Sequence, residues 1–503
     1  MAKRSLIIEK DVDLKTKFDA FGFQEDAFNT LKDLEYAGVF HEQGLGKTKI
    51  AIDLLLYWIG KKSVDTVLII TKKGLVNNWE REFANHTHIR PRILTQDKRK
   101  NFFIFNSPTR VIISHFEILL SESKRLSLFA KGRKVGIILD ESHKIKNPGT
   151  KLTQSAIKLA DLFVKRLILT GTPIANRPYD IWAQIKFLDG GTAFGEDYES
   201  FKNKTDIVPQ LNSDAGKRRS FELSINSIFP KISSFCVRET KNSGIIDLPN
   251  KVVRNIDCEF EANQEQIYNS IRNDLKITVV KEGIPRLDES DAVIKRILRL
   301  VQAASNPLIF DESYQLTPGK YDNLIEIIDE CLAAGQKAIV WTHFTKVADW
   351  LTKKLKHLGA RKIHGKLAYS IRQNAVDDFI ENPSCKILVA TPGAAKEGLT
   401  LTVANHVIFY DRGFSLDDYL QAQDRIHRIS QQETCYVYNL IMKDSIDHWI
   451  DLLLKAKHCA AKLAQGDLEI DEYQEEVDYS FSDILYSALN LQPNKEGFDG
   501  MDK

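Results

Sequence analysis

Scarce cysteine and the absence of long apolar runs limit what this chain can be. Its six cysteines are scattered and form no C-x-x-C pair, which argues against a disulfide framework or a zinc site and favours a reducing compartment. No run of eighteen apolar residues occurs, so the sequence predicts no membrane span. The N-terminus lacks the long apolar core of a secretory signal. We therefore expect a cytoplasmic protein that is neither secreted nor membrane-bound.

Charge of neither sign dominates, because the formal net charge is only +2. This balance neither requires nor excludes a nucleic-acid partner. Acidic residues are concentrated from Asp467 onward, so the rest of the chain carries a net positive charge. A positive charge of this kind favours a polyanionic binding partner. The 503 residues are too many for one hydrophobic core and predict about three units of ~150 residues each.

The most informative stretch is residues 41–48, with the sequence HEQGLGKT. It follows a short apolar run and precedes a segment with helical apolar density, which is the context of a phosphate-binding loop. Gly44 and Gly46 would let backbone N–H groups point at phosphates. Lys47 would neutralise the β- and γ-phosphates of ATP, and the Thr48 hydroxyl would ligate Mg²⁺. His41 stands where this motif usually has its first glycine, and the alternative is an ordinary glycine-rich turn.

Two adjacent carboxylates follow the apolar run 135–139. Buried unpaired acids are costly, but beside Mg²⁺ Asp140 would hold the water shell of the metal and Glu141 would deprotonate the attacking water. The alternative is a capped helix start. Upstream, Gln24 follows an aromatic residue and would hydrogen-bond the edge of adenine, unless it simply begins an amphipathic helix.

Buried strands alternate with helical stretches along the chain, which is typical of parallel α/β sheets. We predict strands at residues 37–40, 67–70, 110–116, 135–139 and 165–169, then at 337–341, 361–364, 386–391, 406–410 and 436–440. Polar residues follow many of these runs, and ligands bind at that edge of a doubly wound sheet. The second half has no phosphate loop of its own, so its edge would be available to a nucleic-acid strand. The candidate phosphate contacts are Thr71, Lys72, Lys73, Ser114, Thr342, His364, Lys366 and Thr391.

Residues 421–431, with the sequence QAQDRIHRISQ, carry two arginines spaced three apart. On a helix Arg425 and Arg428 would share one face. Placed opposite Lys47 they would act as arginine fingers that stabilise charge on the transferred phosphate. The alternative is a surface helix stabilised by salt bridges with Asp424.

These motifs occur in an order that resembles the Swi/Snf family of ATP-driven DNA translocases, within helicase superfamily two. The motifs are Gln24, GLGKT at 44–48, DESHKIKN at 140–147, LTGTPIAN at 169–176 and the arginine-containing stretch at 421–431. The family usually has Asp-Glu-Met-Gly-Leu-Gly-Lys-Thr and Asp-Glu-Ala-His, so His41 and Ser142 depart from its pattern. The Thr-Gly-Thr at 170–172 argues against DEAD-box RNA helicases, which carry Ser-Ala-Thr there.

The resemblance implies an α/β fold with two RecA-like doubly wound parallel-sheet lobes and helical protrusions. It places ATP and Mg²⁺ between the lobes and adds Gln421 and Gly398 to the nucleotide-binding residues. The implied units are an N-terminal lobe at 1–240 with an insertion at about 190–235, a crossing segment and protrusion at 241–318, a C-terminal lobe at 319–465, and an acidic tail at 466–503. The tail has no counterpart in the family, and it would be disordered or compete with DNA.

The implied function is a DNA-dependent ATPase that translocates along duplex DNA through sequence-independent phosphate contacts. Residues 394–402 are similar to the annealing-helicase, fork-remodelling branch, and the size is similar to bacterial or bacteriophage members. Replication, recombination or repair proteins are the expected protein partners. A strand-separating DNA or RNA helicase and an ATP-gated DNA-binding scaffold remain as alternatives.

Overall fold

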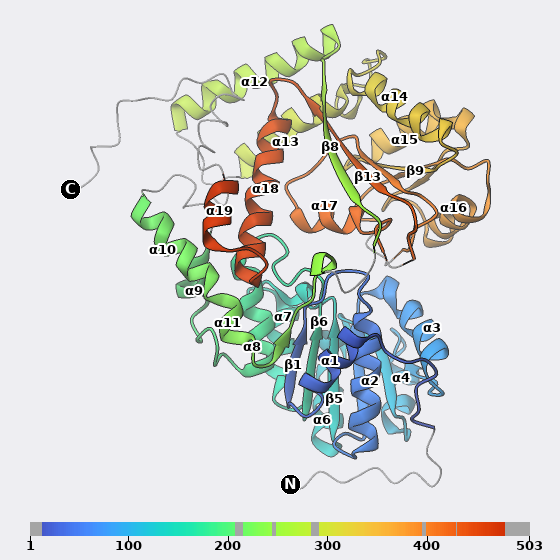
Figure 1. Cartoon of the computed structure of the whole chain (residues 1–503), viewed down its shortest axis with the longest axis vertical. Helices are drawn as coiled ribbons and strands as arrows, with labels where there is room; N and C mark the ends of the chain where they lie inside the picture. The colour runs from blue at the N-terminus through green and yellow to red at the C-terminus, as the bar shows by residue number, and fades with distance from the viewer. Residues whose placement is uncertain are drawn as a thin grey trace. The chain divides into compact units, whose positions relative to one another are not determined.

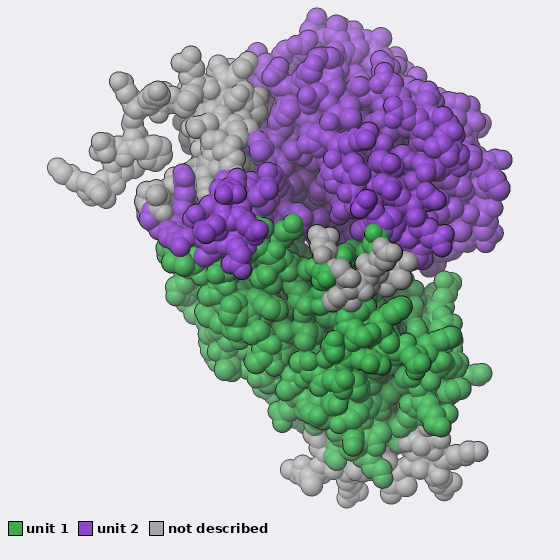
Figure 2. Space-filling model, in the orientation of Figure 1, with its two compact units in different colours: residues 1–206, 220–248, 460–468 green, residues 207–219, 249–459, 469–503 purple. Residues whose placement is uncertain are grey.

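The computed structural model describes residues 13–206, 215–243, 248–282, 291–394, 399–428 and 430–477. The chain divides into two units, which Figure 2 colours separately. Unit 1 comprises Met1–Asp206, Ser220–Leu248 and Ala460–Leu468, and unit 2 comprises Ile207–Arg219, Pro249–Cys459 and Glu469–Lys503. None of the described helices has the length and apolar content needed to cross a membrane.

Unit 1 is built on a seven-stranded sheet in the order β3-β4-β2-β5-β6-β1-β7. Every pairing in it is parallel. The central strands are apolar on both faces, as parallel sheets covered by helices require. The strands are β1 (Tyr36–Val39), β2 (Thr66–Thr71), β3 (Arg92–Ile93), β4 (Val111–His115), β5 (Val135–Asp140), β6 (Lys165–Leu169) and β7 (Cys236–Val237).

Helices α1, α2 and α3 bury their apolar residues against one face of this sheet (Figure 1). Leu54 and Trp58 of α2 share that core with Val67 and Ile69 of β2. The intervening Leu68 is also fully buried, on the opposite face. The helices are α1 (Gly22–Leu31), α2 (Lys47–Gly60), η1 (Lys73–Leu75), α3 (Val76–His86), α4 (Lys98–Asn106), α5 (Ile118–Ser121), α6 (Ser123–Gly132), η2 (Ser142–Ile145), α7 (Lys151–Ala160), η3 (Pro178–Ile181), α8 (Trp182–Asp189), α9 (Tyr198–Thr205), α10 (Ala215–Asn226), α11 (Ile228–Ile232) and η5 (Lys241–Ser243), with α10 counted in unit 2 up to Arg219.

Unit 2 is built on a six-stranded parallel sheet in the order β10-β11-β9-β12-β13-β8. Its strands are β8 (Lys251–Cys258), β9 (Ala338–Trp341), β10 (Arg361–Ile363), β11 (Ile387–Ala390), β12 (His406–Phe409) and β13 (Cys435–Met442). Its helices are α12 (Ala262–Glu282), α13 (Asp291–Ser305), η6 (Pro307–Ile309), α14 (Lys320–Ala333), α15 (Thr345–Lys354), η7 (Lys356–Leu358), α16 (Tyr369–Glu381), α17 (Leu416–Gln423), α18 (Ile446–Gln465) and α19 (Ile470–Glu476), with α18 counted in unit 1 from Ala460 onward.

The predicted α/β class with two doubly wound parallel sheets is confirmed, and every strand predicted from an apolar run is present. The structure adds β3, β7 and β8, which were not predicted. Strand β8 lies at the sheet edge and is largely exposed, with Val253 at 50%. Its polar, charged sequence is typical of an edge strand and lacks the apolar run that identifies a central one. Much of the predicted acidic tail, residues 478–503, lies outside the described residues.

Candidate active site

The loop at residues 41–48 joins β1 to α2 through two left-handed glycines. Gly44 has φ 88° and Gly46 has φ 69°, a region that favours glycine. A Cβ on Gly46 would lie 2.2 Å from Nε2 of Gln24, so the loop needs glycine there for a second reason. The Gln24 amide donates to the carbonyl of Leu45 (3.3 Å). The structure thus brings Gln24 against the loop, and its predicted contact with adenine stays a prediction.

Lys47 begins α2, and its ammonium lies over the loop. Its Nζ donates to the carbonyl oxygens of His41 (2.8 Å) and Glu42 (3.0 Å). Thr48 follows in the first turn of the same helix and is half-buried. The helix N-terminus adds its partial positive charge and unsatisfied N–H groups. Together these groups form a cradle suited to a phosphate chain.

Asp140 ends β5, and two donors converge on one of its carboxylate oxygens. The Thr71 hydroxyl (2.8 Å) and the Trp79 indole N–H (2.7 Å) both donate to Oδ2. Burial and the neighbouring charge of Glu141 raise the pKa of Asp140 to about 6, although the two hydrogen bonds and Lys47 oppose the rise. A half-buried carboxylate that is fixed in this way beside the carboxylate of Glu141 is a suitable oxygen donor for a divalent cation.

Glu141 has a left-handed backbone, with φ 57° and ψ 48°, which is uncommon outside glycine. Such backbone conformations concentrate at functional sites. Its Oε2 lies 3.2 Å from Nδ1 of His143 and 3.8 Å from Nζ of Lys72. Glu141 therefore stands at the end of β5 between two basic groups.

A third strand end completes the site. Thr170 follows β6, and its Oγ1 lies 3.3 Å from Nδ1 of His143. A Cβ on the adjacent Gly171 would lie 2.7 Å from the side chain of Gln43, so this loop packs directly on the phosphate-binding loop. Because β5, β6 and β1 are adjacent and parallel, their carboxyl ends meet at one sheet edge.

The two arginines of the 421–431 stretch are not on a helix, which corrects our prediction. Helix α17 ends at Gln423, and the chain continues in turns. Arg425 is buried and donates to the carbonyl of Leu399 (3.3 Å), whereas Arg428 donates to the Thr400 hydroxyl (2.7 Å). The arginines are thus positioned by the segment at 399–400 and not by helical spacing. Gln421 is buried on α17 and donates to Asp417 (2.7 Å), and Gly398 lies outside the described residues.

Comparison with known protein families identifies the family of this chain. The family model of the SNF2-related domain matches residues 35–309, more than half of the chain. The chain belongs to the SNF2-related family. The model of the helicase conserved C-terminal domain matches residues 319–430 of this SNF2-related protein.

Several individual proteins are similar to this chain. An uncharacterized ATP-dependent helicase of Mycoplasma genitalium is 27% identical over 83% of this chain and 39% of its own length. The human DNA repair and recombination protein RAD54B is 26% identical over 81% of this chain and 50% of its own length. The chain spans only 39% and 40% of the first two Mycoplasma relatives. A solved SWI2/SNF2 ATPase core of Sulfolobus solfataricus in complex with double-stranded DNA is 25% identical, with a TM-score of 0.41, covering 92% of this chain and 98% of that one.

Several residues predicted to contact nucleic acid in this SNF2-related protein are enclosed, which corrects the predicted set. Thr71, Ser114 and Thr342 are fully buried, and His364 and Thr391 are buried. Their polar side chains are not exposed for contact with a DNA strand. His364, for example, lies 3.2 Å from the carboxylate of Asp349.

Three predicted lysines remain accessible to differing degrees. Lys73 and Lys366 are exposed, whereas Lys72 is half-buried beside Glu141. Among the predicted contacts, Lys73 and Lys366 are therefore the two whose side chains are exposed. Lys72 instead lies close to the carboxylate of Glu141, just after β5.

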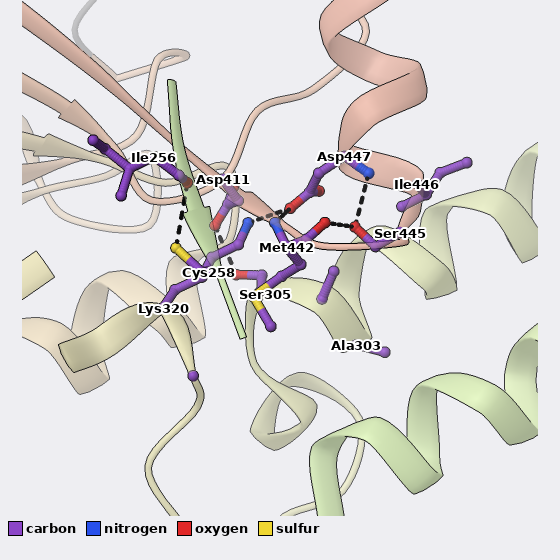
Figure 3. Close-up of polar contacts among 12 residues, drawn as sticks. Ile256, Cys258, Ala303, Ser305, Lys320, Asp411, Met442, Ser445, Ile446 and Asp447 are labelled. Atoms are coloured by element: carbon purple, nitrogen blue, oxygen red, sulfur yellow. Dashed lines mark hydrogen bonds and ion pairs between the residues drawn. The ribbon is translucent and has the colours of Figure 1, made fainter. Parts of the chain in front are cut away.

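Sequence reasoning missed two buried carboxylates of unit 2. Asp411 accepts a hydrogen bond from the Ser305 hydroxyl (2.7 Å; Figure 3). It also accepts one from the Thr342 hydroxyl (2.5 Å), so the polar residue after β9 is turned inward. Asp447 pairs with fully buried Lys320 (2.5 Å), which ties the start of α18 to the start of α14 (Figure 3). No local pattern distinguishes either acid from a surface aspartate, since the partners are far away in sequence.

Proposed function

We propose that this protein is an ATP-driven motor that moves along duplex DNA. One observation carries the ATPase half of this proposal. The segments that follow β1, β5 and β6 bring Lys47, Glu141 and Thr170 to one edge of the unit 1 sheet. His143 connects two of these segments, because its Nδ1 lies near both Glu141 and Thr170. A phosphate cradle beside a carboxylate pair suits hydrolysis of a nucleoside triphosphate.

The residues of unit 1 would divide the chemistry as follows. Lys47 neutralises the β- and γ-phosphates, and Glu141 orients the attacking water and accepts its proton. Asp140 and Thr48 are the residues that would hold Mg²⁺, which supplies further charge neutralisation on the phosphates. Arg425 and Arg428 belong to unit 2, and we propose that they reach the γ-phosphate only when the units close on the nucleotide.

The DNA half of the proposal has separate support. Relatives of this chain are named as ATP-dependent helicases and as a DNA repair and recombination protein. The exposed Lys73 and Lys366 follow strand ends of the two units. Lysine contacts with phosphates carry no sequence information, so binding would be sequence-independent and sensitive to salt. We propose replication, recombination or repair proteins as its protein partners.

A triplex-displacement assay tests this proposal. The protein should release a third strand from a DNA triplex when ATP is present, because movement along the duplex pushes off what is bound to it. It should leave a simple forked duplex unseparated. The matched control is Glu141→Gln, which should keep ATP binding and lose turnover by orders of magnitude.

Strand separation is the rival activity, since two relatives are named helicases. Efficient unwinding of the fork without triplex displacement would favour that rival. ATP binding and DNA binding without any hydrolysis would indicate an ATP-gated scaffold. ATPase stimulation by RNA and not by DNA would reject the DNA motor altogether.

A further inference from the structure

The two most exposed large apolar side chains among the described residues lie on neighbouring helices of unit 1. Leu128 of α6 is 72% exposed and Phe103 of α4 is 69% exposed, and Phe102 beside it is 52% exposed. The two helices meet through other side chains, because the rings of Phe105 and Phe129 are buried with their centroids 5.2 Å apart. A single exposed apolar side chain is ordinary in a soluble protein, whereas a cluster of them indicates a binding surface.

The side chain of Arg125 connects these apolar residues into one surface. Its guanidinium carbon lies 6.0 Å from the ring centroid of Phe102, and its Nη1 donates to the carbonyl of Lys98 (3.0 Å) at the start of α4. The rings of Phe102 and Phe103 meet edge to face, with their centroids 5.8 Å apart. Leu128 follows Arg125 by three residues on α6 and thus lies one turn away on the same side of the helix. We call Phe102, Phe103, Arg125 and Leu128 the α4–α6 surface.

The surroundings of the α4–α6 surface are strongly basic. Between residues 98 and 134 the sequence has nine lysines and arginines against two glutamates. One of these acids, Glu122, is buried and paired with Arg125 (3.1 Å). Three of the bases occupy the first turn of α4, where the helix dipole favours acids, so their placement does not serve helix stability. The exposed cations of the two helices are Lys98, Arg99, Lys100, Lys124 and Lys131.

The α4–α6 surface lies on the other face of the unit 1 sheet from the helix that carries the phosphate-binding loop. The chain crosses the sheet in one direction through α2 and α3, and in the opposite direction through α4 and α6. Because connections between parallel strands are right-handed, the two pairs of helices cover opposite faces. The exposed sides of α4 and α6 are therefore turned away from α2. A partner bound there would leave the phosphate-binding loop accessible.

A partner for this surface must match both its apolar side chains and its cations. Duplex DNA would engage the cations through its phosphates, but its paired bases would leave Phe103 and Leu128 in water. Single-stranded bases stack on flat aromatic rings, whereas Leu128 is aliphatic and the rings of Phe102 and Phe103 stand at 80° to each other. A second copy of the chain would bring like charges together. A peptide with carboxylates and bulky apolar side chains meets both requirements.

We propose that the α4–α6 surface docks an acidic segment of a partner protein that carries bulky apolar side chains. The apolar side chains of that segment pack on Phe103 and Leu128, and its carboxylates pair with the cations of α4 and α6. Arg125 is already held by the Phe102 ring and the Lys98 carbonyl, so its ordering costs little on binding. Docking of this kind is separate from ATP hydrolysis and does not depend on the proposed motor function.

Peptide selection with the full chain tests this docking surface. Short random peptides displayed on phage are selected against the wild-type protein, and enriched peptides are labelled for fluorescence anisotropy. They should combine Asp or Glu with Phe, Leu or Ile. Their binding should weaken about tenfold or more in Phe103→Ser and in Leu128→Ser, because each variant removes an apolar contact. The matched control is Leu223→Ser, which should bind like wild type, because Leu223 is an exposed leucine of unit 1 (52%) outside the surface.

Charge reversal tests the basic half of the surface. The double variant Lys100→Glu with Lys124→Glu should weaken binding of the same peptides and reduce its dependence on salt. Because all these side chains are exposed, Tm and ATP hydrolysis without peptide should match wild type in every variant. A selection that yields no peptide sensitive to Phe103→Ser or Leu128→Ser would overturn the proposal. Weaker binding of a labelled short DNA duplex in the charge variant, with peptide affinity unchanged in both serine variants, would instead assign the surface to nucleic acid.

Discussion

The indole N–H of Trp79 donates to Oδ2 of Asp140 at 2.7 Å, and so α3 helps to hold the carboxylate at the end of β5. Residues that orient a metal-binding carboxylate in this way contribute to metal affinity and activity without touching the substrate. The contact joins two elements of unit 1, and Trp79 itself is 1% exposed.

Replacing Trp79 with phenylalanine should therefore reduce ATPase activity or raise the Mg²⁺ requirement, by about 10–100-fold. Phenylalanine keeps an aromatic ring but removes both the hydrogen bond to Asp140 and the second ring of the indole. Trp58→Phe is the matched control, because Trp58 is equally buried in unit 1 but donates to the carbonyl of Lys32 (2.9 Å). A magnesium titration of the hydrolysis rate measures the effect. Equal losses in the two variants would mean that tryptophan packing, and not the bond to Asp140, is responsible.

Lys72 and Lys73 are neighbours in sequence and should differ in function. Lys72→Ala should lower kcat with little change in the salt dependence of DNA binding, since its Nζ lies 3.8 Å from Glu141. Lys73→Ala should leave kcat near wild type and flatten the slope of log affinity against log salt by about one unit, because one phosphate contact is lost. DNA titrations at several salt concentrations distinguish the two. Identical behaviour of both variants would contradict the separation.

Arg425→Ala and Arg428→Ala should each reduce hydrolysis strongly, because an arginine finger supplies about 10³–10⁵ in rate. Nucleotide affinity should change far less, since the cradle belongs to unit 1. Arg425 also donates to the Leu399 carbonyl, so Tm of each variant must be measured alongside kcat. An arginine whose alanine variant keeps near-normal DNA-stimulated ATPase activity is a structural residue.

His41 should make unit 1 sensitive to acid. Its pKa is about 3 in the folded chain against 6.5 for an ordinary histidine. The unfolded chain therefore binds a proton that the folded chain does not, and stability is lost as pH falls from 6.5 toward 3. The loss between pH 7 and pH 5 is about 2 kcal/mol, at ~1.4 kcal/mol per pH unit below 6.5.

His41→Asn should consequently show a smaller fall in Tm between pH 7 and pH 5 than wild type. The exposed His88 of the same unit supplies the control variant His88→Asn, which should follow wild type. Parallel Tm profiles for His41→Asn and wild type would show that His41 does not titrate in this way.

The local geometry of the predicted phosphate-binding loop and of the strand ends beside it follows from short stretches of sequence. Gly44 and Gly46 have the backbone angles that the loop needs, and Asp140 follows an apolar strand directly. The apolar runs likewise identified the central strands, since a strand buried on both faces must be apolar throughout. Strand β8 was not predicted, because an exposed edge strand does not need to be apolar throughout.

Tertiary structure alone decided which polar groups face one another. Thr71 and Thr342 follow predicted strands, yet each donates to an aspartate 69 residues further along the chain. Asp467 reads as part of an acidic tail, but Arg238 binds it across 229 residues. The sequence by itself determined the central strands, the glycine-containing turn at 44–46 and the family, because glycine conformation and apolar burial act over a few residues. Hydrogen-bond and charge partners were decided by folding, because they depend on residues that only the parallel sheets and the end of α18 bring together.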